Sequence, residues 1–260
     1  MIYLGTSGYS YADWKGVFYP PELSQHELLE FYAREFGAVE LDFTYYRMPT
    51  ADQLKKLASR TPDSFRFAVK AHQDITHNRG SDPGPFAQFR AALAPLQGEG
   101  KLGAVLLQFP NAFRNVDENV EYLGHCFDLL PDLPLIVEFR RDDWLTQHTL
   151  QLLRERGVGF CNVDLPRLPG LLPKTSFVTA PTAYVRFHGR NAKSWWQHEH
   201  AWQRYSYSYS DDELQEWVPH LQEMGEQAEN LYAFANNHWQ GQSVATIKQL
   251  RLLMDRPAVG

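Results

Sequence analysis

Eight short apolar runs, roughly 30 residues apart, constrain the fold of this chain more than any other feature. Most are followed by a stretch with helical periodicity. The runs are residues 2–5, 38–42, 65–70, 103–110, 135–140, 158–164, 183–189 and 230–236. Strands that alternate with helices form parallel sheets with right-handed crossovers, and eight such units close into a barrel of about 250 residues. We therefore predict an α/β fold, a single (β/α)8 TIM-like barrel that occupies residues 1–260 as one domain.

Helical patterns and loop-like segments fill the intervals between these runs. The expected helices are residues 25–35, 50–60, 85–96, 116–130, 146–156, 211–224 and 243–254, and residues 165–180 and 190–209 are expected to be loops. Thr50 is expected to cap a helix, and Ser210 forms a capping box with Glu213. A doubly wound open sheet is the alternative fold, but its GxGxxG turn is absent after the first run, where the sequence reads GTSG.

Charge and cysteine content narrow the class of protein. The formal net charge of -6 argues against long duplex DNA and anionic membranes as partners. No apolar run approaches the roughly 20 residues that span a bilayer, and the first ten residues become polar too early for a signal peptide. The two cysteines, Cys126 and Cys161, lack the spacing of a zinc site or a disulfide framework. We expect a cytoplasmic protein.

Polar side chains gather at the ends of the predicted strands, where TIM barrels place their active sites. These residues are Glu40, Asp42, Lys70, His72, Gln108, Glu138, Arg140, Asp164, Arg186, His188, Asn236 and Asn237. Side chains alternate along a strand, so Glu40 and Asp42 share one face while Val39 and Leu41 share the other. If the polar faces point inward, a deeper layer holds Glu40, Lys70, Glu138 and Arg186. Buried charges must be paired, so a purely structural ion-pair plug is an alternative to an active site.

Further candidates for ligand binding lie in the predicted loops. Thr44 and Arg47 follow the second strand, in a stretch whose mixture of aromatic, hydroxyl and cationic groups suits the rim of a pocket. Trp14, Trp144 and Trp195 are expected to stack on a ligand, because aromatic residues in loops are less easily explained by core packing.

Eight sequence motifs together resemble the YecE-like family, known as domain of unknown function 72. They are GTSGYSYADWKGVFYP, VELDFTYYRMP, FRFAVKAHQDITH, LGAVLLQFP, VEFRRDDW, YVRFHGR, YSYSYSDDEL and FANNHWQG, and they run nearly from end to end. The resemblance implies a TIM-like barrel similar in outline to those of endonuclease IV and xylose isomerase, but no established reaction. This chain has Asp42, Asp143 and Thr246 where the family usually has asparagine, serine and asparagine.

The mixed polar residues favour an enzyme that acts on a small anionic ligand, either phosphate-bearing or derived from nucleic acid. The expected class is a hydrolase of phosphoester or glycosidic bonds. Lys70, Arg47, Arg140, Arg186 and Arg190 could clamp phosphate, because guanidinium forks bind its oxygens in pairs. Glu138 or Asp42 could act as general base, and His188 or His72 as general acid.

Three other functions stay open on the sequence. A divalent metal could bind among the acids and histidines, but Lys70, Arg140 and Arg186 would repel it, so we assign no cofactor and no metal ligand. A glycoside hydrolase would use two carboxyl groups, yet Gln108 and His188 stand at strands four and seven, where barrel glycosidases commonly carry them. A non-catalytic module that binds a ligand or nucleic acid is the third alternative.

Overall fold

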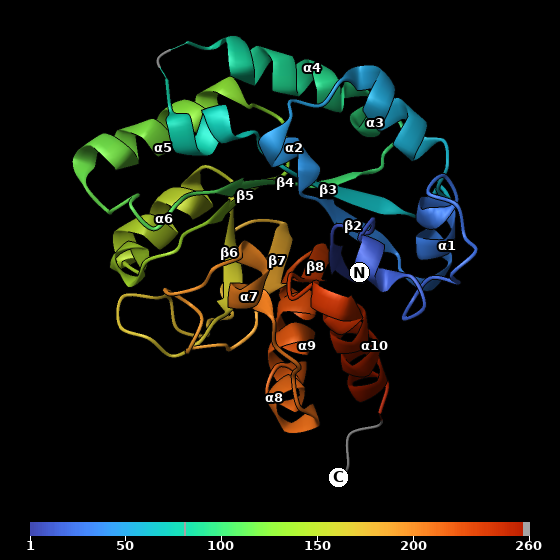
Figure 1. Ribbon diagram of the computed structural model, residues 1–260. Helices are drawn as coiled ribbons and strands as arrows, with labels where there is room; N and C mark the ends of the chain where they lie inside the picture. Colours follow the sequence, from blue (N-terminus) through green and yellow to red (C-terminus); the bar gives the residue numbers. More distant parts are fainter. Residues whose placement is uncertain (81, 257–260) are drawn as a thin grey trace.

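Eight parallel strands close into a barrel in the computed structural model, which describes residues 1–80 and 82–256 (Figure 1). The strands are β1 (Ile2–Ser7), β2 (Ala38–Leu41), β3 (Arg66–Lys70), β4 (Leu102–Gln108), β5 (Leu135–Glu138), β6 (Gly159–Asp164), β7 (Thr182–Phe187) and β8 (Asn230–Ala235). They pair in sequence order, and β8 returns to pair with β1 from Ile2 opposite Leu231 to Thr6 opposite Ala235. The predicted TIM-like barrel is confirmed. The last four residues of the predicted 1–260 domain lie outside the described part.

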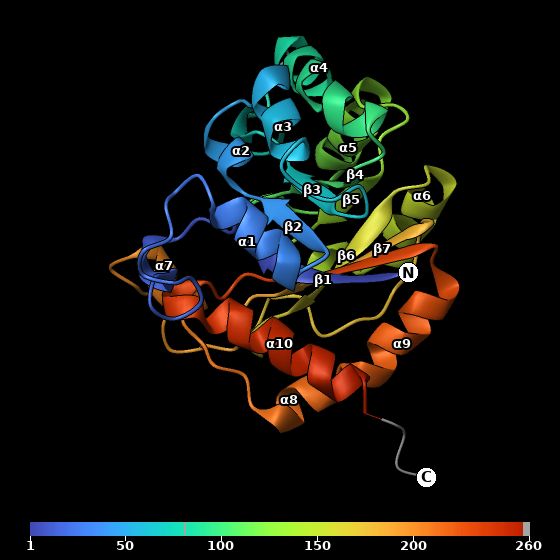
Figure 2. The same cartoon turned by 90° about the vertical axis from the view of Figure 1, so that its right-hand side faces the viewer.

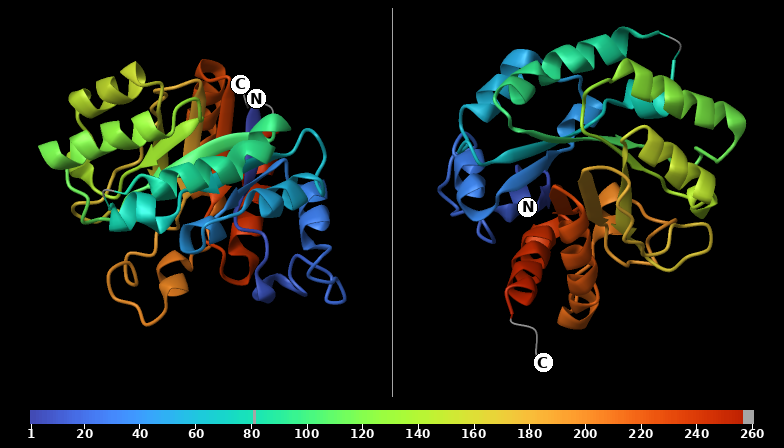
Figure 3. Two further views of the ribbon diagram at one scale, coloured as in Figure 1. Left: turned by 90° about the horizontal axis from the view of Figure 1, so that it is seen from above. Right: turned by 180° about the vertical axis from the view of Figure 1, so that it is seen from behind.

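Helices surround the barrel and cover the outer faces of its strands (Figures 1 and 3). The α-helices are α1 (Leu28–Glu35), α2 (Phe43–Tyr46), α3 (Ala51–Ala58), α4 (Gly84–Gly98), α5 (Asp117–Leu129), α6 (Gln147–Glu155), α7 (Ala201–Tyr205), α8 (Asp211–Gln215), α9 (Val218–Gln227) and α10 (Gln242–Met254). Three short 3₁₀ turns are η1 (Ala12–Trp14), η3 (Asp142–Trp144) and η4 (Trp239–Gly241), and η2 (Asp74–Asn78) is a π-turn. Thr50 and Ser210 cap α3 and α8 as predicted.

Three segments differ from the prediction. Residues 43–46 form α2 rather than a loop, and the long segment 190–209 contains α7. The expected helix 211–224 is divided into α8 and α9, because Pro219 lacks the N–H group that a helix interior needs. Proline is accepted in the first turn of a helix, so a new helix begins at Val218, one residue before it.

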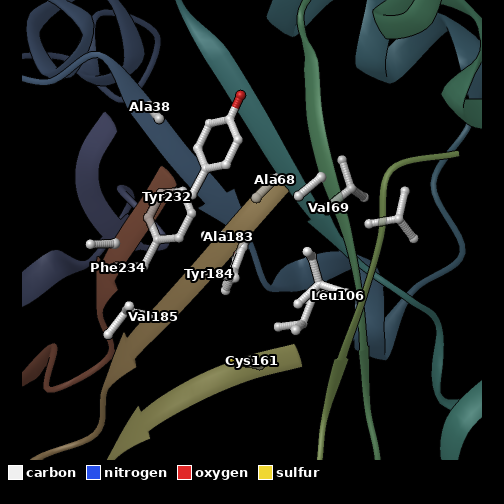
Figure 4. Close-up of a cluster of buried hydrophobic side chains, with 14 of the residues drawn as sticks. Ala38, Ala68, Val69, Leu106, Cys161, Ala183, Tyr184, Val185, Tyr232 and Phe234 are labelled. Atoms are coloured by element: carbon white, nitrogen blue, oxygen red, sulfur yellow. The ribbon is translucent and has the colours of Figure 1, made fainter. Parts of the chain in front are cut away.

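The barrel interior is filled by apolar side chains below its mouth. Tyr184 of β7 packs against Tyr232 and Phe234 of β8, with ring centroids 6.4 Å and 5.4 Å apart (Figure 4). Gly5 of β1 is required at this level, because a Cβ atom there would lie 2.0 Å from the carbonyl oxygen of Ala38. The interior of the barrel is therefore a packed core.

Loops after the strands gather at one end of the barrel. Helix α7 and the segment that follows β1 lie at this end, opposite the N-terminus (Figure 2). This is the carboxyl end of the strands, which we call the barrel mouth. Within residues 1–80 and 82–256, no helix combines the length and the apolar character needed to cross a membrane.

Candidate active site

A buried ion-pair layer crosses the barrel directly below the mouth. Arg186 of β7 donates from Nη1 to Glu138 of β5 at 2.6 Å and from Nη2 to Glu40 of β2 at 2.6 Å. Strands β2, β5 and β7 are not neighbours, so these contacts form only inside the barrel. Ser7 and Tyr184 donate to the same Glu40 carboxylate, each at 2.6 Å. Glu40, Glu138 and Arg186 therefore lie in the deep layer expected from strand alternation. Lys70, expected in the same layer, instead lines the pockets and pairs with none of these charges within the described residues.

Glu138 is committed to neighbours inside the protein. Its side chain is 0% exposed. Burial opposes its ionisation, but Arg140, Arg186 and His188 outweigh burial and hold the pKa of the carboxyl well below its usual range. A carboxylate that is fully enclosed and strongly stabilised in its charged form is a weak proton acceptor. Glu138 is therefore better placed to stabilise the cations around it than to react with a ligand.

His188 is enclosed beside Glu138 and held as the neutral imidazole. Its Nε2 lies 3.0 Å from Oε1 of Glu138, and its Nδ1 lies 3.0 Å from the amide nitrogen of Asn236. The amide can only donate, so Nδ1 accepts and Nε2 carries the single proton. Burial and the charge of Arg140 lower the pKa of His188 to about 3, although Glu138 opposes this change.

Two adjoining pockets open above the ion-pair layer. The central pocket, of about 230 Å³, is lined from most sides of the barrel by Tyr11, Asp42, Tyr46, Lys70, Gln108, Arg140, Arg186, Trp202, Tyr205, Asn236 and His238. The side pocket, of about 270 Å³, is lined by Tyr45, Tyr46, Lys70, His77, Gln108, Pro110, Asn111, Arg140, Leu171, Trp195, Trp196, Arg204 and Tyr205. Residues common to both walls are Tyr46, Lys70, Gln108, Arg140 and Tyr205.

The side pocket is cationic. Lys70, Arg140 and Arg204 line it, and no aspartate or glutamate of the described chain does so. Burial and the charges of Lys70 and Arg140 lower the pKa of His77 to about 4, so its ring is neutral near pH 7. Opposite charge is therefore missing from the walls of this pocket, and an anion would supply it.

Each of the three cations of the side pocket has N–H donors that could still bind a ligand. Lys70 places Nζ 4.5 Å from the centre of the Tyr45 ring and makes no hydrogen bond or ion pair with a described residue. Arg140 approaches Oε1 of Glu138 through Nε at 2.8 Å and also interacts with the Tyr205 hydroxyl, which leaves part of its five N–H donors for a ligand. Arg204 lies over Trp195 at 5.5 Å, and its buried Nε is likewise without a partner in the described structure.

Tyr205 joins these cations in both pockets. Burial alone would raise the pKa of its hydroxyl, but the positive charges of Arg140, Arg204 and Lys70 outweigh burial and lower it. Burial is also the main cause that lowers the pKa of Lys70, against the attraction of Asp42. A lower pKa brings the Tyr205 phenol and the Lys70 amine closer to the pH range in which side chains exchange protons with a ligand.

Asp42 is the only carboxylate among the described residues that line the central pocket. Its Oδ1 is buried and accepts no hydrogen bond in the described structure, and Nη2 of Arg186 lies 3.8 Å away. A ligand that carries a hydroxyl or amine proton would satisfy this oxygen.

Four predicted site residues face away from the mouth. Trp14 and Trp144 are 0% exposed, and each donates its indole N–H to a carbonyl, of His238 and Phe113 respectively. The expected stacking of these two on a ligand is wrong, because their rings pack in the core. Asp164 and Asn237 lie on the outward face of their strands.

Contacts of Asp164 and Asn237 explain their orientation. Asp164 pairs in register with Phe187, one position beyond the inward Arg186, and it binds Arg190, Tyr209 and Trp217. The amide of Asn237 donates to the carbonyl of Tyr207 and to the hydroxyl of Thr246, which belongs to helix α10 outside the barrel.

Three further candidates have local roles or lie outside both pockets. The hydroxyl of Thr44 lies 2.8 Å from the carbonyl of Leu41 and 2.6 Å from that of Lys70, which fixes α2 against β3. His72 is buried, with Nδ1 3.2 Å from a carboxylate oxygen of Asp74. Arg47 is exposed and lines neither pocket.

Other predicted residues do line the pockets. The central pocket is lined by Lys70, Gln108, Arg140, Arg186 and Asn236, and the side pocket by Trp195.

Tyr205, Arg204 and His77 line the pockets but were not among the predicted residues. All three belong to segments that follow a strand, where neither strand alternation nor helical periodicity indicates the direction of a side chain. The only sequence signal was the aromatic density of segment 190–209.

Within the described residues, no group of three or more histidine, cysteine, aspartate and glutamate side chains is arranged to hold a metal ion. The barrel mouth instead brings together lysine, arginine and tyrosine.

Comparisons with known proteins identify close relatives of this chain. The family model described as "Protein of unknown function DUF72" matches residues 3–259. The UPF0759 protein YunF of Bacillus subtilis is 34% identical over 271 residues, covering 98% of this chain and 95% of that protein. The UPF0759 protein YecE of Escherichia coli K12 is 30% identical over 134 residues, covering 50% of this chain and 45% of YecE.

Two solved structures share the fold. A DUF72 family protein from Thermotoga maritima MSB8 is 37% identical, with a TM-score of 0.91, over 98% of this chain and 100% of that one. A DUF72 family protein from Enterococcus faecalis V583 is 28% identical, with a TM-score of 0.88, over 99% and 96% of the two chains. Both structures carry the same family description, and neither description states a reaction.

Proposed function

The chain belongs to the DUF72 family, as its motifs predicted, and we propose that its barrel is an enzyme that binds a small phosphate-bearing molecule at the mouth and acts on it. One observation carries the proposal. Three cations with unused donors, Lys70, Arg140 and Arg204, line one pocket that has no carboxylate among its described residues.

Electrostatics gives the physical reason. Lys70 and Arg204 pair with no carboxylate of the described residues, whereas Arg140 contacts Glu138. Cations that are removed from water without enough counter-charge are costly, and an arriving anion relieves that cost. Phosphate offers several acceptor oxygens, and a guanidinium fork can donate to two of them at once. Arg186 does not take this role, because its terminal nitrogens are occupied by Glu40 and Glu138.

Aromatic side chains at the pocket edges suit the remainder of such a ligand. Trp196 is 51% exposed and Tyr46 is 75% exposed, and both line the side pocket. Their faces offer stacking surfaces for a sugar or a base. A nucleotide or a sugar phosphate therefore matches the site better than an isolated inorganic anion.

Proton transfer in this site would fall to Asp42 and Tyr205. Both line the central pocket, and each differs from the enclosed Glu138 in being open to a ligand. Glycoside hydrolysis receives less support, because Glu40 and Glu138 are both 0% exposed and saturated by donors, which leaves Asp42 without a second free carboxylate.

Calorimetric titration tests the proposal. We would titrate the protein with ribose 5-phosphate and adenosine monophosphate, and with ribose and adenosine as matched compounds without phosphate. The phosphorylated compounds should bind more tightly. The variants Arg140→Gln and Arg204→Gln should each lose about tenfold or more in affinity, since hydrogen bonds to charged groups contribute about 1.5–3 kcal/mol.

The matched control is Arg34→Gln, at an exposed position on α1. Equal binding of phosphorylated and unphosphorylated compounds, or equal affinities of Arg140→Gln and Arg34→Gln, would refute the phosphate site. Incubation of each bound compound, followed by phosphorus NMR and mass spectrometry, separates an enzyme from a binding module. A ligand that binds at the mouth and is recovered unaltered would favour the module.

A further inference from the structure

Two lysines of this barrel lie in contrasting environments. Lys101 is 3% exposed and is held by the carbonyls of Ala58 and Thr61, each 2.8 Å from Nζ, with two carboxylates within 4.0 Å. Lys70 is half-buried, and its Nζ lies 4.5 Å from the Tyr45 ring centre without a hydrogen bond or ion pair to a described residue. Lys101 has the contacts of a structural cation. Lys70 has an amine that points into open space and is left for a ligand.

The surroundings of Lys70 weaken its hold on a proton. The amine lies 4.5 Å from the centre of the Tyr45 ring and forms no ion pair with any residue that the structure describes. Burial lowers the pKa of Lys70, with Arg186 and Arg140 acting in the same direction and Asp42 and Glu138 against it. A lysine of this kind reaches its neutral, nucleophilic form more readily than one on the surface.

We propose that Nζ of Lys70 captures the carbonyl carbon of a phosphate-bearing aldehyde or ketone as an imine. This inference rests on the proposed phosphate site, because Lys70 lines both pockets. Arg140 and Arg204 would hold the phosphate in the side pocket, while the carbonyl carbon reaches Lys70 at the boundary with the central pocket.

The reaction needs no partner beyond the carbonyl compound. The neutral amine adds to the carbonyl carbon, so a C–N bond forms, the π electrons move to oxygen, and oxygen gains the proton that nitrogen loses. A second proton then reaches the hydroxyl of this carbinolamine, the C–O bond breaks, and water leaves the protonated imine. Tyr205 lines the same two pockets and supplies a hydroxyl for this proton transfer.

Reductive trapping tests the proposal on the full chain. The protein is incubated with dihydroxyacetone phosphate or glyceraldehyde 3-phosphate, then treated with sodium borohydride and mapped by peptide mass spectrometry. We expect one reduced adduct on Lys70, at least about tenfold more abundant than on Lys55, which is exposed on α3. Dihydroxyacetone without phosphate should give less adduct on Lys70. Arg140→Gln should lower the yield only for the phosphorylated compounds.

Two variants of Lys70 test whether the adduct is lost because the amine is gone and not because the protein is unfolded. Lys70→Arg and Lys70→Met should both take no adduct at this position, and circular dichroism and thermal melting establish that each is folded. Adducts spread evenly over Lys55 and other exposed lysines would overturn the proposal. Phosphate binding by calorimetry without an adduct on Lys70 would overturn this inference and leave the proposed function standing, whereas loss of both would reject the two together.

Discussion

Nη1 of Arg186 lies 2.6 Å from Oε2 of Glu138, and both side chains are closed off from solvent. Arg186 also donates from Nη2 to Glu40, so one guanidinium joins two strands that are not adjacent in the sheet. The pair places charge at the centre of the barrel and supports the pocket floor. Arg186 is the cation that the two glutamates share.

Replacement of that cation should destabilise the protein strongly. Arg186→Met leaves Glu40 buried without its counter-charge and leaves Glu138 with Arg140 alone, and breaking a buried pair in this way costs about 3–5 kcal/mol. The free energy of unfolding from guanidinium titration, followed by tryptophan fluorescence, measures the loss.

Arg156→Met is the matched control, since Arg156 pairs with Asp128 on the surface. This exposed pair should contribute less than about 1 kcal/mol. If the two variants lost equal stability, the buried layer would not hold the barrel together.

His188 should make the stability depend on pH. Its folded-state pKa of about 3 lies below the roughly 6.5 of an unfolded histidine, so the unfolded chain binds the extra proton between these values. The protein should therefore lose stability as pH falls from about 6.5 towards 3, by up to about 1.4 kcal/mol per pH unit from this residue.

The difference between wild type and His188→Asn isolates this contribution. The free energy of unfolding of the variant, measured between about pH 7 and pH 5, should fall less steeply by about one proton. The exposed His148→Asn should retain the wild-type slope. An identical slope for His188→Asn and wild type would show that the buried imidazole does not carry the effect.

Removal of the Asp42 charge should tighten phosphate binding. Its carboxylate lines the central pocket beside the cations and repels an anion, so Asp42→Asn should raise the affinity for ribose 5-phosphate about two- to tenfold. Calorimetry measures the change, with the exposed Asp52→Asn as control. A weaker affinity would instead assign Asp42 to the binding of a ligand proton.

Asp164 should matter for stability and not for binding. It accepts from Trp217 at 2.7 Å and from Tyr209 at 2.7 Å, and its removal leaves these buried donors unsatisfied. Asp164→Ala should cost about 1–3 kcal/mol of unfolding free energy. Affinity for ribose 5-phosphate should stay at the wild-type value, because the side chain faces the helical layer.

The exposed Asp255→Ala serves as the stability control, and its unfolding free energy should stay close to wild type. A marked loss of phosphate affinity in Asp164→Ala, in a protein that remains folded, would contradict the outward placement.

Much of the architecture could be predicted because it depends on local patterns. Strand and helix periodicities, repeated eight times, leave few arrangements other than a closed barrel. Alternation also grouped Glu40, Glu138 and Arg186 correctly at one depth. The caps at Thr50 and Ser210 were visible because each depends on a side chain and a backbone N–H three residues later.

Residues in the loops could not be placed in the same way. Trp14 and Trp195 belong to similar aromatic segments and both are buried, yet only Trp195 of the two also lines the side pocket. The sequence likewise did not indicate which way the Asp164 side chain points, because both faces of a parallel strand in a barrel are covered by apolar residues.

The sequence alone determined the eight-fold repeat, the family, and the strand ends at which polar side chains collect. Tertiary structure decided which of those side chains meet, and which keep a free donor. The terminal nitrogens of Arg186 donate to two glutamates, whereas Lys70, Arg140 and Arg204 retain N–H donors for a ligand in the side pocket. The reason is physical: periodicity fixes the spacing of side chains along one element, but pairing depends on distances between elements that only barrel closure and loop packing set.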